Sequence, residues 1–303
     1  MSTFTSLAVD VRRGSTFIAW APAAVVPITV QILTWRSPSW VMMWSVALAI
    51  YFSLKWLTLA DARTHSPSLA RSLSYLLLWP GMNANAFLGH EPAGAPPTAR
   101  AWLAAFVKIA FGLMLMLVVT PWLIDDHRLL AGWCGMTGII FVLHFGVFHL
   151  LSLVWRSRAI AAEPIMDSPL LARSLSDFWG RRWNLAFRDL SFHYVLRPLA
   201  GRVPLTTATL LVFTLSGFVH EWVITVPAQS GWGGPTLYFL LQGLGLVAEK
   251  SDWGRRLGLG RGVIGQVSCA AVTIGPVGLL FPAAFVLRVI IPTLTACGVL
   301  NGT

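Results

Sequence analysis

His220 and Glu221 are the residues whose types and position point most directly to chemistry. They are the only titratable side chains in the apolar run from Leu205 to Val226, which is long enough to span a bilayer. Titratable groups at membrane depth are costly unless they face protein or a water-filled cavity, so they are uncommon there. Histidine titrates nearest neutrality, which suits a general base that takes a proton from a hydroxyl group. We therefore predict that His220 is catalytic.

The neighbours of His220 fit the same helix. Ser216 lies one turn earlier on the same face, so we expect its hydroxyl to orient the imidazole, while Gly217 lets a neighbouring backbone come close. Glu221 points about 100° away around a helix, so we expect it to pair with an Arg or Lys elsewhere. We count Ser216 and Glu221 as substrate-binding residues. The structural alternative is a histidine that is only hydrogen-bonded within the bundle.

A second group of residues lies in the longest polar interruption, residues 156–202. Ser174-x-x-Asp177 is a capping-box pattern and predicts a helix with Asp177, Arg181, Asn184 and Arg188 along one side. Guanidinium groups on such a helix can hold phosphates, and the Asn184 amide can donate to a developing oxyanion. The alternative is a basic helix that anchors the chain at the lipid headgroups. This alternative explains the Arg and Trp residues equally well, but it does not explain Asn184.

From this second group we predict Asn184 as a catalytic residue and Arg181, Arg182 and Trp183 as substrate-binding residues. We predict no metal site. An HExxH zinc motif is excluded because Ile224 stands where the second histidine would be required.

Two further histidines, His144 and His149, lie in another apolar run. A spacing of five places them on different faces of a helix, so they make a poor metal pair. They are expected to be packed polar residues or to line a tunnel, and neither they nor Asn83 receives a role.

The composition sets the fold class that must position these residues. The 303 residues are 56% hydrophobic and only 11% charged, with a mean hydropathy of +0.69, which is typical of a polytopic membrane protein. The net charge of +10 is therefore attributed to topology and anionic lipid, and no basic stripe resembles a nucleic-acid footprint. The three cysteines have no CxxC pattern and no Cys/His cluster, so we expect them to be buried small apolar residues, and they do not indicate the redox compartment.

We predict an all-α transmembrane bundle that encloses a tunnel, with about seven to nine spans. Residues 73–88 are expected to form a re-entrant or interfacial element, with Tyr75 and Trp79 at the headgroups. The expected spans are 17–35, 40–59, 102–123, 132–155, 205–226, 235–248 and a last run over 263–291 that is one kinked helix or two short pieces. With the basic loops 156–202 and 250–261 in the cytoplasm, the N-terminus is cytoplasmic too.

The two central motifs resemble a known family. Phe178-Trp-Gly-Arg181-Arg182-Trp183-Asn184 followed by Ser216-Gly217-x-x-His220-Glu221 resembles the signature of the wax synthase branch of the membrane-bound O-acyltransferases. The Trp79-Pro-Gly-Met82 and His144-Phe-Gly-x-Phe-His149 blocks are similar to further blocks of its shorter bacterial members. The resemblance covers residues 75–225, and it implies that His220 is the catalytic histidine and Asn184 the second polar position of the family.

The resemblance implies an enzyme of one integral-membrane domain, residues 1–303, that moves an acyl group from acyl-CoA to a hydroxyl. The expected acceptor is a long-chain alcohol, acyl-CoA is the co-substrate, no cofactor is needed, and the location is a bacterial inner membrane or its equivalent. Expected partners are membrane lipid and a lipophilic acceptor, not nucleic acid. The open alternatives are a sugar, glycolipid or secondary-metabolite acceptor, a non-catalytic lipid-binding protein, and a transporter.

Overall fold

The computed structural model describes residues 20–63, 67–89 and 94–301. Within these ranges every regular element is a helix. Five helices are long and apolar enough to cross a membrane, namely Ser39–Ala60, Ala99–Leu123, Arg128–Arg156, Leu205–Ala228 and Gly262–Leu280. The predicted all-α polytopic membrane fold is therefore confirmed.

Several of these long helices are divided by π-helical turns into consecutive elements. After the helix Trp20–Thr34, the elements are α2 Ser39–Ala60, α3 Leu69–Leu78, α4 Ala84–Leu88, α5 Ala99–Met114, η1 Leu115–Val119, α6 Thr120–Leu123, α7 Arg128–Ile140, η2 Phe141–Val147 and α8 Phe148–Arg156. The loop region then holds η3 Pro169–Leu171, α9 Leu175–Asp177, η4 Phe178–Arg182, α10 Leu185–Ser191, η5 Phe192–Leu196 and α11 Arg197–Leu199. The last part holds α12 Leu205–His220, η6 Glu221–Thr225, α13 Val226–Ala228, α14 Gly234–Lys250, α15 Asp252–Arg256, α16 Gly262–Ile274, α17 Val277–Leu280, α18 Ala283–Phe285, η7 Val286–Ile290 and α19 Ile291–Ala296.

The predicted spans differ from the observed helices in three places. Residues 17–19 of the expected span 17–35 lie outside the described residues, and the rest of it contains the helix Trp20–Thr34, which is shorter than the five long helices. The expected span 235–248 forms α14, whose 17 residues leave it shorter than the five long helices. The expected run 263–291 is two pieces, because the chain leaves helical geometry at Phe281 and Pro282 precedes the first residue of α18. Proline has no N–H and is best accommodated at such a helix start.

Residues 73–88 form two short helices, α3 and α4, joined by the extended segment that contains Trp79. We expected Tyr75 and Trp79 at the headgroups, and that placement is wrong. Both are buried in an apolar cluster with Phe87 and Leu190. The Tyr75 hydroxyl is hydrogen-bonded to Thr58, 2.7 Å away, and burial of an aromatic ring is favourable once its polar tip has a partner.

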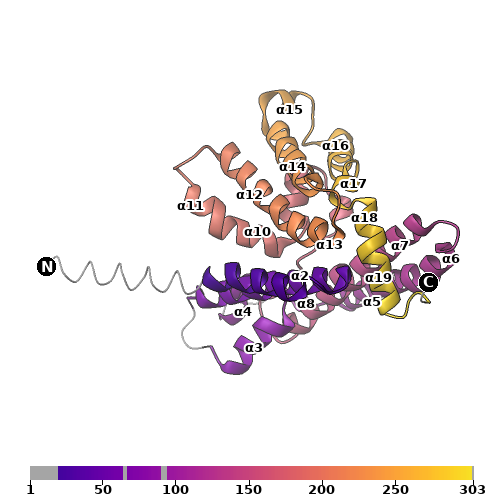
Figure 1. Ribbon diagram of the computed structural model, residues 1–303. Coiled ribbons are helices and arrows are strands. Elements are labelled where there is room, and N and C mark those ends of the chain that lie inside the picture. Colours follow the sequence, from indigo (N-terminus) through magenta and orange to yellow (C-terminus); the bar gives the residue numbers. More distant parts are fainter. Residues whose placement is uncertain (1–19, 64–66, 90–93, 302–303) are drawn as a thin grey trace.

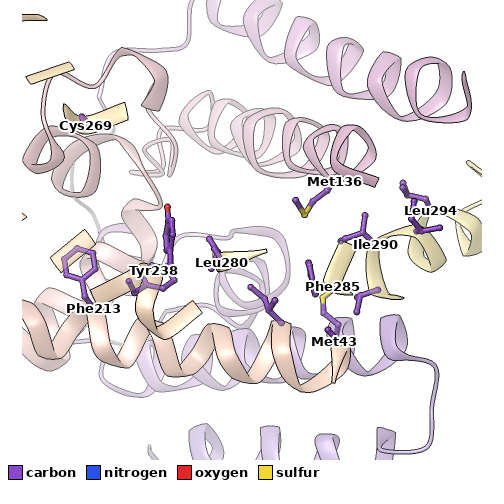
Figure 2. Close-up of a cluster of buried hydrophobic side chains, with 14 of the residues drawn as sticks. Met43, Met136, Phe213, Tyr238, Cys269, Leu280, Phe285, Ile290 and Leu294 are labelled. Atoms are coloured by element: carbon purple, nitrogen blue, oxygen red, sulfur yellow. The ribbon is translucent and has the colours of Figure 1, made fainter. Parts of the chain in front are cut away.

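The larger apolar core gathers side chains from helices far apart in the sequence (Figure 2). Met43 of α2, Met136 of α7, Phe213 of α12 and Leu294 of α19 all belong to it. Phe178 and Trp179 pack against this core, although they belong to the polar interruption 156–202. The segment that carries Asn184 therefore enters the bundle.

Helices α12 and α14 pack against each other in opposite directions, above α2 in the view of Figure 1. A Cβ built on Gly217 would lie 2.7 Å from the Cα of Thr236, and one on Gly243 would lie 3.1 Å from the side chains of Leu210 and Phe213. The expected close approach at Gly217 is confirmed. This register places the start of α12 level with the end of α14.

The contact at Gly217 gives a first testable prediction. Gly217→Ala should lower the free energy of unfolding by about 1–3 kcal/mol, because the added methyl group meets backbone that is unable to move aside without displacing α14. Thermal unfolding of the purified protein in detergent measures this. Gly278→Ala in α17 is the matched control, since a Cβ there meets nothing within 4 Å. Equal melting temperatures for both variants would contradict the close approach.

Candidate active site

The segment Ser174–Arg188 was predicted as one helix, and this prediction is wrong. The capping box begins as expected, because the Ser174 hydroxyl accepts a hydrogen bond from the Asp177 amide at 3.0 Å. The helix, however, ends after the π turn η4 at Trp183, and a new helix, α10, begins at Leu185. The four polar residues expected along one side therefore lie on two helices.

Asn184 is the residue at the break. Its backbone is left-handed, with φ of 42° and ψ of 62°, a conformation that asparagine adopts more readily than most residues. Its Oδ1 accepts the amide N–H of Phe187 at 3.2 Å and so caps α10. No hydrogen bond from its Nδ2 is found within the described residues. The capping bond thus fixes the side-chain amide of Asn184 and leaves its Nδ2 amino group as a hydrogen-bond donor.

His220 is the last residue of α12, immediately before the π turn η6. Its Nδ1 lies 2.7 Å from the backbone carbonyl oxygen of Ser216. A carbonyl oxygen accepts hydrogen bonds only, so Nδ1 carries the proton and Nε2 of the neutral ring has the lone pair. We expected the Ser216 hydroxyl to orient the ring, and its carbonyl does so instead.

His220 and Asn184 line one cavity of about 510 Å³, a volume typical of small-molecule sites. Ser216 and Trp183 line it as well. The rest of the wall comes from α9, η4, α10, η5, α12 and α14, as Ser176, Trp179, Gly180, Phe187, Arg188, Asp189, Ser191, Phe192, Leu196, Leu205, Thr209, Val212, Phe213, Phe239, Leu246 and Lys250. The structure thus brings together four of the seven predicted site residues.

The cavity has a deep end and a mouth. Phe239 and Ser216, beside His220, are 4% and 3% exposed, whereas Leu205 is 67% exposed and Lys250 is exposed too. Since α12 and α14 are antiparallel, Leu205 and Lys250 lie at the same level. His220 is fifteen residues further along α12, about 22 Å deeper at 1.5 Å per residue. The imidazole is therefore reached by a long, mostly apolar passage.

The other three predicted site residues are not among the cavity-lining residues. Arg181 is exposed, and Arg182 makes a salt bridge of 2.7 Å to Asp177. Glu221 was expected to pair with an Arg or Lys. Its carboxylate instead accepts the Thr225 hydroxyl at 2.7 Å and the Thr236 amide at 3.1 Å. Arg182 and Glu221 thus hold the walls of the cavity together.

The unassigned polar residues also have structural partners. Asn83 caps α4 through its Oδ1, and His149 lies 3.4 Å from Lys108. His144 packs against Phe148, and its Nδ1 has no hydrogen-bond partner among the residues that the structure describes. In the part of the chain that the structure describes, no group of three His, Cys, Asp or Glu residues could hold a metal ion.

Sequence reasoning missed the contribution of α14, from which Phe239, Leu246 and Lys250 line the cavity. The ring centroids of Phe239 and His220 are 4.4 Å apart. One signal was available, because Gln242 is an uncharged amide in an otherwise apolar run. Lys250 was predicted to belong to the basic loop 250–261, which we used to assign the membrane topology, and not to the site.

The fold and the cavity define an integral membrane protein in which an oriented imidazole and an oriented amide face one enclosed passage. Residues 162–241, which contain both side chains, match the Membrane bound O-acyl transferase family. The predicted resemblance to the wax synthase-like branch of this family is confirmed.

Three curated relatives illustrate the similarity. The chain is 30% identical over 168 residues to the probable long-chain-alcohol O-fatty-acyltransferase 3 of Arabidopsis thaliana, covering 51% of this chain and 48% of that protein. It is 38% identical over 96 residues to the long-chain-alcohol O-fatty-acyltransferase of Simmondsia chinensis, covering 28% and 27%. It is 37% identical over 68 residues to the acyl-CoA–sterol O-acyltransferase 1 of Arabidopsis thaliana, covering 20% of each chain. The matches thus span less than half of each relative.

The salt bridge between Asp177 and Arg182 gives a prediction on how stability depends on pH. Burial raises the pKa of Asp177, but hydrogen bonds from Arg182 and the Arg173 amide and the nearby guanidinium charges outweigh it, so the pKa is lowered. Its contribution to stability is then present above the ordinary carboxyl pKa of about 3.9 and is lost as the pH falls through the lowered value. Asp177→Asn should therefore be less stable than the parent at pH 7, and the difference should shrink toward pH 3.

Thermal unfolding between pH 7 and pH 3 measures this difference. Asp252→Asn is the control, because the Asp252–Arg255 pair is exposed and contributes little. A gap between Asp177→Asn and the parent that stays constant over this range would contradict the assignment.

Proposed function

We propose that this chain is an O-acyltransferase that moves an acyl group from acyl-CoA to the hydroxyl of a long-chain alcohol, with His220 as general base. One observation carries the proposal. The Nε2 lone pair of an oriented histidine and the amide of a cap-fixed asparagine face the same apolar cavity, deep within the bundle. A histidine that only stabilised packing would not require this passage.

The proposed reaction is direct transfer. The alcohol oxygen attacks the thioester carbonyl carbon while its proton passes to Nε2 of His220. The carbon–sulfur bond then breaks, the ester is released, and the departing thiolate takes the proton back from His220 as free CoA. The Asn184 amino group donates to the carbonyl oxygen as negative charge develops there, which is favourable in a site that excludes water.

The donor enters through the mouth of the cavity. Lys250 and Arg188 line it, so their charges are available to the phosphates of CoA, a role that we first expected of Arg181, Arg182 or Arg188. Arg188 is already bonded to Asp189 at 2.5 Å and to the Gly180 carbonyl at 3.0 Å, so Lys250 is the more available cation. The relative named as an acyl-CoA–sterol acyltransferase favours this donor. From the positive-inside rule we propose that this mouth and the N-terminus face the cytoplasm.

The acceptor is assigned from the lining and the relatives. Phe187, Phe192, Leu196 and Val212 make most of the passage apolar, which fits an alkyl chain better than a sugar. Two of the relatives are named for long-chain alcohols.

Loss of His220 tests the proposal. His220→Ala should lower the rate of CoA release from acyl-CoA and a long-chain alcohol by about 10²–10⁴-fold, because the general base is lost. A thiol reagent follows CoA release by the purified protein, and mass spectrometry identifies the ester. His127→Ala is the matched control, since His127 is exposed in the turn before α7. Transfer by His220→Ala at the parental rate, with the protein correctly folded, would refute the role of this residue.

The mouth gives a separate prediction. Lys250→Ala should raise the KM for acyl-CoA by about tenfold and leave kcat nearly unchanged, because the interaction with phosphate is the same in the ground state and the transition state. The effect should weaken in high salt. Arg256→Ala, an exposed cation of the same basic loop that does not line the cavity, should leave the KM unchanged. Equal KM values for both variants would remove Lys250 from the donor site.

A further inference from the structure

We propose that one face of α14, carrying Gln242 and Glu249, is the positioning element that holds Asn184 in the cavity that His220 also lines. The inference rests on the proposed function. Neither residue lines the cavity, and both are almost completely excluded from solvent, Gln242 at 0% and Glu249 at 7% exposed. They act on the cavity through their hydrogen bonds to the Trp179 side chain and to the backbone amides of α9.

The face is defined by helical spacing. Phe239, Gln242, Leu246 and Glu249 are separated by three, four and three residues, so they form one stripe along α14. Phe239 contacts His220, with ring centroids 4.4 Å apart, and also Trp179, at 6.0 Å. One end of the stripe therefore touches both the base and the segment that leads to Asn184.

Gln242 holds the middle of that segment. Its Oε1 accepts the indole N–H of Trp179 at 3.4 Å, and its Nε2 donates to the Val272 carbonyl at 2.6 Å. The indole only donates and the carbonyl only accepts, so the two partners fix the amide in a single orientation. Trp179 is thereby linked through α14 to α16.

Glu249 holds the start of the same segment. Its Oε2 accepts the Leu175 amide at 2.6 Å and its Oε1 accepts the Ser176 amide at 3.1 Å. These are the first amides of α9, which have no partner within their own helix. Among the described residues Glu249 forms no salt bridge, so the two backbone amides are what compensates its burial. Without this carboxylate, both amides would lose their acceptor.

The expected kinetic effect follows from this geometry. Glu249 contacts neither substrate in the proposed site, so its loss should leave binding almost unchanged. The loss of Glu249 should alter the distance between the Asn184 amino group and the carbonyl oxygen of the acyl group. A shift of about 1 Å can cost about 100-fold in rate. The effect should therefore fall on kcat and not on KM.

The experiment uses the purified full chain in detergent and compares Glu249→Ala, Glu249→Gln and the parent. We expect Glu249→Ala to lower kcat by about 10–100-fold with KM for acyl-CoA within about twofold. Glu249→Gln keeps one carbonyl oxygen as an acceptor and should fall between the two. Glu163→Ala is the matched control, because that carboxylate is 62% exposed and its ion pair is with Arg156, which lies outside the segment.

Hydrogen–deuterium exchange supplies a readout that does not depend on activity. In Glu249→Ala the amides of residues 175–184 should exchange faster, while α12 keeps its parental protection. Unchanged exchange of residues 175–184, or faster exchange with unchanged kcat, would overturn the proposal. A rise in the KM for acyl-CoA without a fall in kcat would overturn it as well. If Glu249→Ala fails to fold, the same criteria apply to Glu249→Gln.

These measurements separate the two proposals. If the parent chain shows no acyl transfer, the proposed function fails. The exchange of residues 175–184 then still decides whether Glu249 holds the segment that carries Asn184.

Discussion

Two carboxylates bound to backbone amides at helix starts, the half-buried Glu221 and the buried Glu249, determine how the cavity is built. Glu221 accepts the amide of Thr236 in the first turn of α14, and Glu249 accepts the first two amides of α9. Helix starts carry unpaired N–H groups and a partial positive charge, so a carboxylate satisfies both needs at once. Inside a bundle, where water is scarce, few other partners are available to either group.

The same two contacts link α14 to both catalytic candidates. Its start is fixed to the helix that carries His220, and its end fixes the segment that leads to Asn184. At Gly217 the absence of a side chain lets α12 and α14 approach closely enough for Glu221 to reach Thr236. Helix α14 therefore links the positions of His220 and Asn184, although only part of that helix lines the cavity.

The sequence predicted the all-α membrane fold, and the structure confirms it. This prediction succeeded because hydropathy is a local signal. The sequence also singled out Asn184 and His220, and the structure places both on the wall of one cavity, while their catalytic roles stay predictions. The pairing of Glu221 with an Arg or Lys was not found, because a backbone amide leaves no mark in the sequence. The single helix from Ser174 to Arg188 was wrong for a related reason, since the left-handed turn at Asn184 is held by contacts with Met166 and Ile165, which are distant in the sequence.

The break at Asn184 is itself a consequence of where the site lies. Irregular backbone inside a membrane bundle is tolerated where it is buried in protein or lines a cavity. The chain satisfies this condition, since Leu185 donates to the Ile165 carbonyl at 2.9 Å and Asp167 donates to the Arg182 carbonyl at 2.8 Å. Two π turns, η4 and η5, line the same cavity, and a third, η6, begins directly after His220. Such turns occur often at functional sites. In a continuous helix the Asn184 side chain would not cap the start of α10. The irregular backbone is therefore the feature that lets this capping residue also face the cavity.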